Sequence, residues 1–397
     1  MSDPLLHFRA EFPILATTNY MVSNSLGAMP RAVPARLAEY ADQWATRGVR
    51  AWAQGWWEMP VTVGDEIAPL IGAGAGEVAM VPNVSIAQAQ ILSALDYRSD
   101  GRDTIVMTEL DFPSVRYVYD QLATRLGARI VVVPSDDGIS IDEDRLLAAI
   151  DERTRLVAIS HVLFRSAYVL DAARICAHAR RMGALVSLDA YHSVGIIPVD
   201  VKALQPDFLT GGVLKWLCGG PGGCFLWASP AAGEQTAPAL TGWQAHEHPF
   251  AFEPEMTYAN GAWRWLTGTP SIPALFAAVA GARLLQQAGM TAIREKSVRQ
   301  TTRLIELADA RGFAVTAPRA ADRRGGTVAF DVPHAREVAQ ALLARDVIVD
   351  YRPGAGIRVA PHFYSSDEEV EGVVGAIDEI LAKDEWRKYT HETLVVT

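Results

Sequence analysis

The alternation of short apolar runs with helical stretches between residues 62 and 228 constrains the fold more than any other feature of the sequence. Helical stretches lie at 85–95, 114–126, 142–150 and 171–182. The apolar runs between and around them have the length and composition of buried strands: Val78–Val81, Thr104–Thr108, Arg129–Val133, Arg155–Ser160, Ala184–Asp189, Asp207–Gly211 and Gly223–Trp227. This order predicts an α/β fold with a mostly parallel sheet of about seven strands flanked by helices, and ligands at the carboxyl ends of the strands.

Two further regions flank the predicted sheet. Residues 1–60 are expected to form an N-terminal arm with a helix from Pro34 to Thr46. Residues 61–288 would form the large domain, and residues 289–397 a smaller C-terminal α+β domain. Strands of this small domain are expected at Ala314–Thr316, Gly326–Asp331, Val347–Tyr351 and Gly356–Ala360, with helices near 335–345 and 367–383.

Composition narrows the class of protein. The chain has 397 residues, of which 50% are hydrophobic and 21% charged, which is typical of a globular protein. A net charge of −10 without any Lys/Arg run argues against nucleic-acid binding. The N-terminus has no apolar signal region, and no segment approaches the roughly 18 apolar residues of a membrane span, so we expect no membrane association and a cytoplasmic location. Three cysteines suggest neither a disulfide framework nor a zinc site.

Lys215 has an unusual setting. It lies between the apolar segment Phe208 to Leu214 and a Gly-rich turn at residues 219–223. Desolvation favours a neutral amine, which is a nucleophile whose commonest covalent use is a Schiff base with an aldehyde. A lysine that extends from a strand end to solvent is the alternative. The other lysines lie among polar or charged residues: Lys202, Lys296, Lys383 and Lys388.

Two other segments offer partners for such a lysine. Asp189 ends a predicted strand, and His192 follows three residues later. An aspartate at this place can keep a pyridine nitrogen protonated, as in pyridoxal phosphate sites, although a capping Asp and a surface His are the alternative. The segment Pro82-Asn83-Val84-Ser85 precedes a helix, so its amides and the Ser85 hydroxyl could bind a phosphate, a weak signal when taken alone.

Other motifs are less informative. Aromatic residues gather in the arm and again between Trp243 and Phe252, which fits either packing or a pocket for a bulky amino acid. The glycines between residues 72 and 76 precede a predicted strand instead of following one, which is the wrong context for a dinucleotide site. His246-Glu247-His248 offers only two histidine ligands, so no metal site is expected.

Taken together, these motifs resemble kynureninases, within the class V aminotransferase group of fold type I pyridoxal phosphate enzymes. The resemblance covers nearly the whole chain. It rests on Asn24-Ser25-Leu26-Gly27 with the Trp-rich arm, Gly64-Asp65 with Leu70-Ile71-Gly72-Ala73, Phe112-Pro113-Ser114, Asp189 with His192, Lys215 with Gly219-Gly220-Pro221-Gly222, Gly242-Trp243, Gly268-Thr269-Pro270, and Arg358 before Ala360-Pro361.

The resemblance implies a catalytic role for Lys215, which would form the Schiff base with pyridoxal 5′-phosphate and move the Cα proton. Asp189 would pair with the pyridine nitrogen, and Arg358 would bind the substrate α-carboxylate. The remaining cofactor-binding residues implied are Val84, Ser85, Phe112, Ser114, His192, Trp243 and Thr269, with Thr269 coming from the second subunit of a homodimer. Asn24 and Ser25 would contact the substrate.

Three positions differ from the family pattern. Leu214 stands where a tyrosine usually precedes the lysine, Val115 where an aspartate follows the Phe-Pro-Ser/Thr motif, and Leu163 where an asparagine is common. All three are aliphatic where the family has a polar group. The cofactor site is therefore expected to be kept, whereas the proton transfers that define the reaction are open. Ser114, His161, Tyr191 or an ordered water would have to supply protons.

The resemblance implies hydrolytic Cβ–Cγ cleavage of kynurenine or a related bulky amino acid through a quinonoid intermediate. Alternatives that share this intermediate are β-elimination or C–S lyase chemistry, transamination and racemisation. Desulfuration through a persulfide is disfavoured, because all three cysteines precede residue 225, away from the C-terminal loop that would carry the reactive one. A catalytically inactive relative that binds a partner protein is the alternative outside enzymes.

Overall fold

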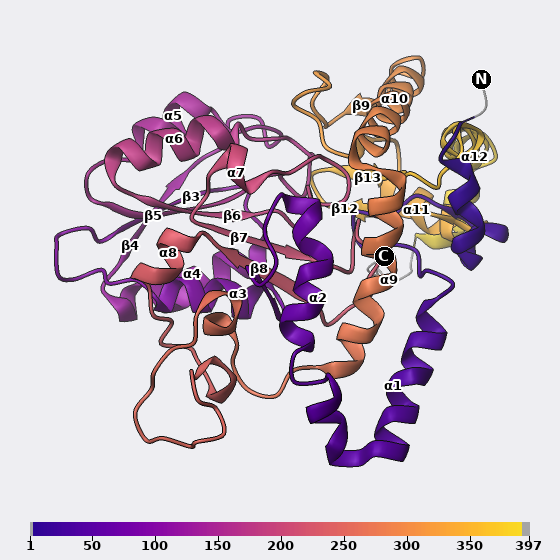
Figure 1. Cartoon of the computed structure of the whole chain (residues 1–397). Coiled ribbons are helices and arrows are strands. Elements are labelled where there is room, and N and C mark those ends of the chain that lie inside the picture. The colour runs from indigo at the N-terminus through magenta and orange to yellow at the C-terminus, as the bar shows by residue number, and fades with distance from the viewer. Residues whose placement is uncertain (1–2, 391–397) are drawn as a thin grey trace.

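The computed structural model describes residues 3–390 and is built around one large sheet (Figure 1). Its seven strands have the order β2-β8-β7-β6-β5-β3-β4. Neighbours from β7 to β4 pair in parallel, and only β8 runs antiparallel to both of its neighbours. The strands are β2 Val78–Val81, β3 Thr104–Thr108, β4 Arg129–Val133, β5 Thr154–Ser160, β6 Leu185–Asp189, β7 Phe208–Gly212 and β8 Cys224–Ala228. The predicted mostly parallel sheet is confirmed.

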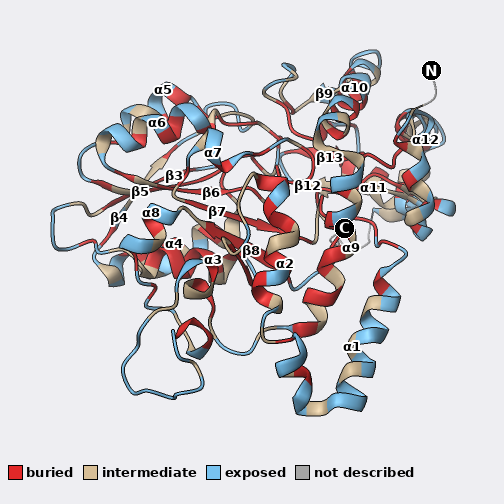
Figure 2. Cartoon of the chain, in the orientation of Figure 1, coloured by how far each residue is buried: buried red, intermediate tan, exposed pale blue. Residues whose placement is uncertain are grey.

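Helices cover both faces of this sheet, because its strands alternate apolar side chains between two cores. In β3, Val106 faces one core, whereas Ile105 and Met107 face the other. Figure 2 shows the strands almost wholly buried and the outer sides of the helices exposed. The helices of this region are α2 Met59–Ile67, α3 Val84–Ser93, α4 Pro113–Leu126, α5 Glu143–Ala148, α6 Ala172–Met182, α7 Val201–Leu204, α8 Pro230–Gln235 and α9 Ile272–Ala288.

A second, smaller sheet with its own core lies near the C-terminus. Its strands are antiparallel in the order β12-β13-β10-β9. The elements of this part are α10 Met290–Asp309, β9 Ala314–Val315, β10 Val328–Asp331, α11 Ala335–Leu343, β11 Val347–Ile348, β12 Asp350–Arg352, β13 Gly356–Val359 and α12 Asp367–Ala382. A capping box between Ser366 and Glu369 begins α12.

The N-terminal segment joins the small sheet region to the large one. Strand β1 (Asn19–Tyr20) pairs in parallel with β11, and Arg9 forms an ion pair with Glu369 at the start of α12. Helix α1 (Val33–Arg47) then packs against α9 (Figure 1). The N-terminal segment therefore contacts both sheet regions, whereas the boundaries at 60/61 and 288/289 stay predictions.

Two local predictions need correction. The strand expected at 347–351 is two strands, because β11 pairs with β1 whereas β12 pairs with β13. The helix expected from Ser85 begins at Val84, and its N-cap is Asn83, whose side chain accepts a hydrogen bond from the Ile86 amide. Within residues 3–390, no helix combines the length and the apolar character needed to cross a membrane.

Candidate active site

Lys215 and Asp189 meet at the carboxyl edge of the large sheet. Asp189 is the last residue of β6, and Lys215 lies three residues beyond the end of the neighbouring strand β7. The Nζ atom of Lys215 lies 2.5 Å from Nε2 of His192. The lysine, the aspartate and the histidine expected from the sequence are therefore brought to one place, as parallel strand ends require.

The pKa of Lys215 is lowered to about 7, chiefly by burial and next by the positive charge of Arg358. Asp189 opposes this shift, but Lys215 has no carboxylate within ion-pair distance among the described residues. Its amine is thus substantially neutral at neutral pH and available as a nucleophile or base.

The expectation that Lys215 alone has an apolar setting is wrong. Lys296 is also buried, and its amine contacts Asp3 at 2.8 Å and the Phe363 carbonyl at 2.7 Å. The two lysines nevertheless differ in chemistry. Burial lowers the pKa of Lys296, but the hydrogen bond and the charge of Asp3 oppose this effect, so Lys296 is a structural cation whereas Lys215 is not.

His192 and Asp189 are both buried, and burial shifts their pKa values in opposite directions. Burial, followed by the charge of Lys215, holds the pKa of His192 well below its usual value, so the ring is neutral. With its proton on Nδ1, this ring accepts a hydrogen bond from the lysine amine. Burial raises the pKa of Asp189 to about 6, while the Tyr191 amide, which donates to Oδ1 at 2.9 Å, acts in the opposite direction.

Phe112 forms an aromatic wall beside the lysine. Its ring centre lies 5.4 Å from Nζ of Lys215 and 5.3 Å from the ring centre of Phe164. Phe112 is the N-cap residue of α4, and Asp111 before it accepts hydrogen bonds from the amides of Thr108 and Ser160, each at 2.7 Å. This buried carboxylate holds the ends of β3 and β5 together. Sequence analysis missed it, although it stands directly before the Phe-Pro-Ser motif.

The amides of Val84 and Ser85 at the start of α3 are exposed by the helix geometry, because the first turn of a helix contains no acceptor for them. Because Asn83 caps the helix through Ile86, the Ser85 hydroxyl is not needed as a cap, and Val84 and Ser85 have no acceptor within the helix. A buried network fixes this helix to the sheet: Gln88 donates to Thr210 of β7 at 3.0 Å and accepts from Tyr119 of α4 at 2.9 Å. Gln88 and its partners were not predicted, since the sequence showed only one polar residue on an apolar helix face.

Arg358 is buried next to these groups but is already engaged. Its guanidinium donates to the Phe164 carbonyl and forms an ion pair with Asp350, its direct cross-strand neighbour. Asp350 also pairs with Arg352 at 2.6 Å. Both arginines lower the pKa of Lys215, and the cluster that they form with Asp350, one carboxylate with two guanidinium groups, has an excess of positive charge that suits a carboxylate ligand.

The N-terminal segment lies against the turn that carries the lysine. The Gly27 amide donates to the Leu214 carbonyl at 2.7 Å, and a Cβ at Gly27 would overlap the carbonyl of Lys215. Asn24 in this segment is buried, and neither atom of its side-chain amide has a hydrogen-bond partner among the described residues. Ser25, which follows, is half-buried.

The small domain holds the same turn from its other side. His362 donates from Nε2 to the carbonyl of Trp216, directly after the lysine, at 2.7 Å. Tyr364 bonds Ser23 at 2.8 Å. Neither residue was singled out from the sequence, because the partners of both, the Trp216 carbonyl and the Ser23 hydroxyl, are far away along the chain.

Trp243 and Thr269 are not brought to the lysine within one chain. Trp243 is 38% exposed and packs with Trp57 and Phe250, with ring centres 4.8 and 5.7 Å away. Thr269 lines a small cavity next to Pro82 and Gly222. In the described part of the chain, no hydrogen bond or ring contact links either residue to Lys215.

Both ring nitrogens of His246 have hydrogen-bond partners. Nδ1 accepts from the His248 amide, and Nε2 donates to the Glu255 carbonyl.

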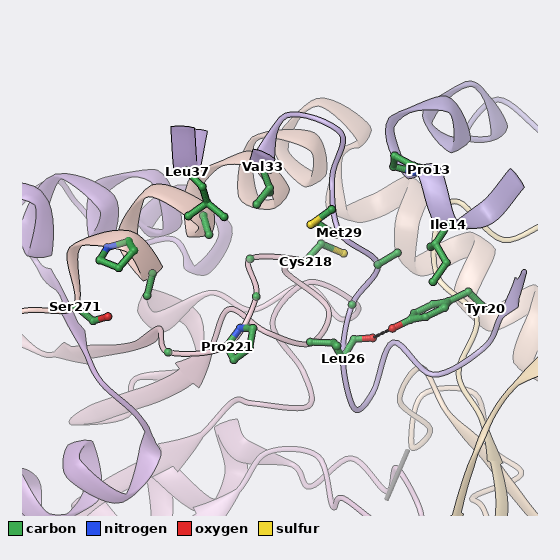
Figure 3. A pocket seen from close by; sticks show the side chains of 18 residues that line it. Pro13, Ile14, Tyr20, Leu26, Met29, Val33, Leu37, Cys218, Pro221 and Ser271 are labelled. Carbon is green, nitrogen blue, oxygen red and sulfur yellow. Dashed lines mark hydrogen bonds between the residues drawn. The ribbon is translucent and has the colours of Figure 1, made fainter. Parts of the chain in front are cut away.

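A cavity of about 640 Å³ lies beside the Gly-rich turn (Figure 3). Its lining is apolar and comes from the N-terminal segment, the turn and the start of α9, with Met29, Leu37 and Pro221 among its members. Tyr20 closes one end, where its hydroxyl donates to the Leu26 carbonyl at 2.8 Å. Neither Lys215 nor Asp189 lines this cavity.

The positions that differ from the family pattern have different surroundings. Val115 and Leu163 are fully enclosed in the two cores of the large domain, where aliphatic side chains are favoured. Leu214 is half-buried beside the lysine. Of the three positions, Leu214 is the one directly next to Lys215. Its aliphatic side chain therefore changes the surroundings of the lysine amine.

The described residues fit pyridoxal phosphate. The first-turn amides of α3 suit its phosphate, the Asp189 carboxylate suits its pyridine nitrogen, and the neutral Lys215 amine suits its aldehyde. The side-chain amide of Asn24, which is expected to contact the substrate, is buried and has no hydrogen-bond partner among the described residues.

Comparison with known proteins agrees with this assignment. The family profile described as "Aminotransferase class-V" matches residues 20–371. A kynureninase from Burkholderia pseudomallei is 33% identical over 97% of this chain and 94% of its own length, and one from Pseudomonas fluorescens is 34% identical with the same coverage.

Solved structures agree on the fold. An apo cysteine desulfurase from Thermococcus onnurineus matches 96% of this chain and 99% of its own with a TM-score of 0.85 at 24% identity. A mutant of C-DES with glycine covalently linked to its PLP cofactor matches 93% of this chain and 98% of its own, with the same TM-score at 22% identity. The chain is therefore a pyridoxal 5′-phosphate-dependent member of the class V aminotransferase family, similar to kynureninases.

Proposed function

We propose that this protein hydrolyses the Cβ–Cγ bond of a kynurenine-type amino acid with a bulky side chain. The observation that carries the proposal is the Lys215–His192 contact beside Asp189, in a chain that is one-third identical to kynureninases along nearly its whole length. Phe112 and Phe164 supply an apolar wall next to the amine, which suits an aromatic side chain.

Pyridoxal phosphate, when bound, supplies an aldehyde for the substrate amine and an electron sink for the charge left at Cα. Val84 and Ser85 would bind its phosphate, Asp189 its pyridine nitrogen and Lys215 its aldehyde carbon. Arg358, released in part from Asp350, would bind the substrate α-carboxylate.

Lys215 would then act as the base at Cα, because burial keeps a large share of its amine neutral. His192 would share the proton taken up by the amine, since its Nε2 atom lies within hydrogen-bond distance of Nζ. A water molecule would attack the γ-carbonyl, the Cβ–Cγ bond would break, and the products would be alanine and an aryl acid.

β-Elimination is the second candidate. Unlike the hydrolysis, this reaction releases no acyl group and needs no proton donor for that step. Leu214, beside the lysine, cannot donate a proton. C-DES, a fold neighbour, is a cystine C–S lyase. Release of a persulfide through a protein cysteine is not supported, because Cys176, Cys218 and Cys224 are all buried and burial raises the pKa of each thiol.

A spectral screen of amino acids against the holoenzyme, followed by product analysis, separates these reactions. We expect alanine and anthranilate from kynurenine. Pyruvate with ammonia from a β-substituted amino acid would establish elimination instead. A keto acid with aminated cofactor would establish transamination, and loss of optical activity without cleavage would establish racemisation. A colourless protein that takes up no cofactor would refute the whole proposal.

A further inference from the structure

The Tyr191 ring occupies a space that only glycine at position 212 leaves open. Gly212 is the buried last residue of β7, and a Cβ built on it would overlap ring carbons of Tyr191 and lie 2.6 Å from its hydroxyl oxygen. The ring centre of Tyr191 lies 5.5 Å from Nζ of Lys215. The phenol is therefore packed into the site by β7, two residues after Asp189.

The hydroxyl of this phenol contacts the Cys224 thiol of β8 and the Val84 amide at the start of α3. Burial raises the pKa of Tyr191 well above its usual value, the charge of Cys224 and its hydrogen bond raise it further, and a hydrogen bond from the Val84 amide acts in the opposite direction. Val84 is the first residue of α3, whose first-turn amides form the proposed phosphate site. A neutral phenol at this position keeps its hydrogen for donation to an anion.

The residues on either side of the lysine offer no such group. Leu214 is aliphatic, and Trp216 is buried with its ring packed on His362, at 5.3 Å between ring centres. We propose that Tyr191 donates its phenolic hydrogen to the phosphate of the cofactor and so completes the phosphate site next to Lys215. This inference rests on the proposed use of the α3 amides and identifies a further cofactor-binding residue within that same site.

The test compares pyridoxal 5′-phosphate with pyridoxal, which lacks the phosphate, as ligands of Tyr191→Phe. The substitution keeps the ring and removes only the hydroxyl. We expect binding of the phosphorylated form to weaken about tenfold or more, because a hydrogen bond to a charged group is lost, and binding of pyridoxal to stay unchanged. Tyr389→Phe, in the small domain, is the matched control and should alter neither value.

Two outcomes overturn the inference: equal weakening of both ligands, which marks a structural role, or no weakening at all. Gly212→Ala is a second variant, since it retains the hydroxyl but displaces the ring, and it should produce the same loss confined to the phosphorylated form. A folded Gly212→Ala protein with the full preference for the phosphorylated form would contradict the inference. Wild-type protein that binds no pyridoxal 5′-phosphate would refute the proposed function itself.

Discussion

His362 of the small domain donates a hydrogen bond to the carbonyl of Trp216, the residue directly after Lys215, at 2.7 Å. The carbonyl belongs to a turn that also receives the Gly27 amide at Leu214. The reactive lysine is thus held by groups that come from the first thirty and the last forty residues of the chain, as well as by its own strand.

Replacing His362 by Leu should loosen this turn without removing any group that contacts substrate. The buried Trp216 carbonyl would lose its donor, which costs about 1–3 kcal/mol of unfolding free energy. Denaturant unfolding of the apo protein measures this loss, and kcat should fall more than KM rises. Unchanged stability would show that the bond contributes nothing to the turn. His7→Leu, at an exposed histidine, is the control.

Gly27→Ala tests the close approach of the N-terminal segment. An added Cβ would overlap the Lys215 carbonyl, so we expect a loss of at least about 2 kcal/mol and weaker cofactor binding. Gly233→Ala is the matched control, because nothing lies within 4 Å of a Cβ there and Gly233 is inside helix α8. That variant should be neutral or slightly stabilising. Equal behaviour of the two variants would contradict the described contact.

Lys215→Ala and Lys296→Met should have opposite effects. Lys215→Ala should abolish covalent attachment of the cofactor, measured as a mass increase after borohydride reduction, and should leave stability unchanged or raised. Lys296→Met should keep the attachment but cost about 3 kcal/mol, because it leaves Asp3 without its buried partner. Covalent attachment at Lys296 would disprove the assignment.

The pH dependence of stability provides an independent test of Lys215 in the apo protein. Its pKa is about 7 in the folded state and 10.5 in the unfolded state, so between these values the unfolded chain binds more protons. Stability of wild type relative to Lys215→Met should therefore rise with pH from about 7 to about 10.5, by at most about 1.4 kcal/mol per pH unit. A flat or falling difference would contradict a lowered pKa.

Substitution of Asp350 should reveal how Arg358 is used. Asp350→Asn removes the buried negative charge that binds this guanidinium, so KM for the amino acid should fall or stay constant. Arg358→Gln should raise KM about a hundredfold or more, because a charged hydrogen bond to the carboxylate is lost together with its partner charge. A larger rise in KM for Arg352→Gln than for Arg358→Gln would assign the carboxylate to Arg352 instead.

The sequence predicted the large sheet and the cluster of Lys215, Asp189 and His192 because both depend on local patterns. The carboxyl ends of parallel strands lie at one edge of the sheet, so polar residues there converge regardless of how the helices pack. The ion pair of Arg358 with Asp350 was not predicted, although the two residues are only eight positions apart, since it depends on the register of β12 with β13.

Burial of Lys296 could not be predicted either, since Asp3, the carboxylate that compensates its charge, lies 293 positions away in the sequence. Its neighbours in α10 include Glu295 and Arg299, which look like an exposed helix face. The reason for a glycine at position 212 could not be predicted either, because a strand can end in glycine for many reasons. The structure shows that the Tyr191 ring fills the space that a side chain would occupy.

The hold of Gly27 and His362 on the lysine turn also has a consequence for synthesis on the ribosome. The large sheet ends at Ala228, but the donor to the Trp216 carbonyl emerges more than 130 positions later. A nascent chain can therefore complete its main sheet while the turn at Lys215 is still open. The lysine turn should therefore reach its final geometry only after the segment that carries His362 has been synthesised and has folded.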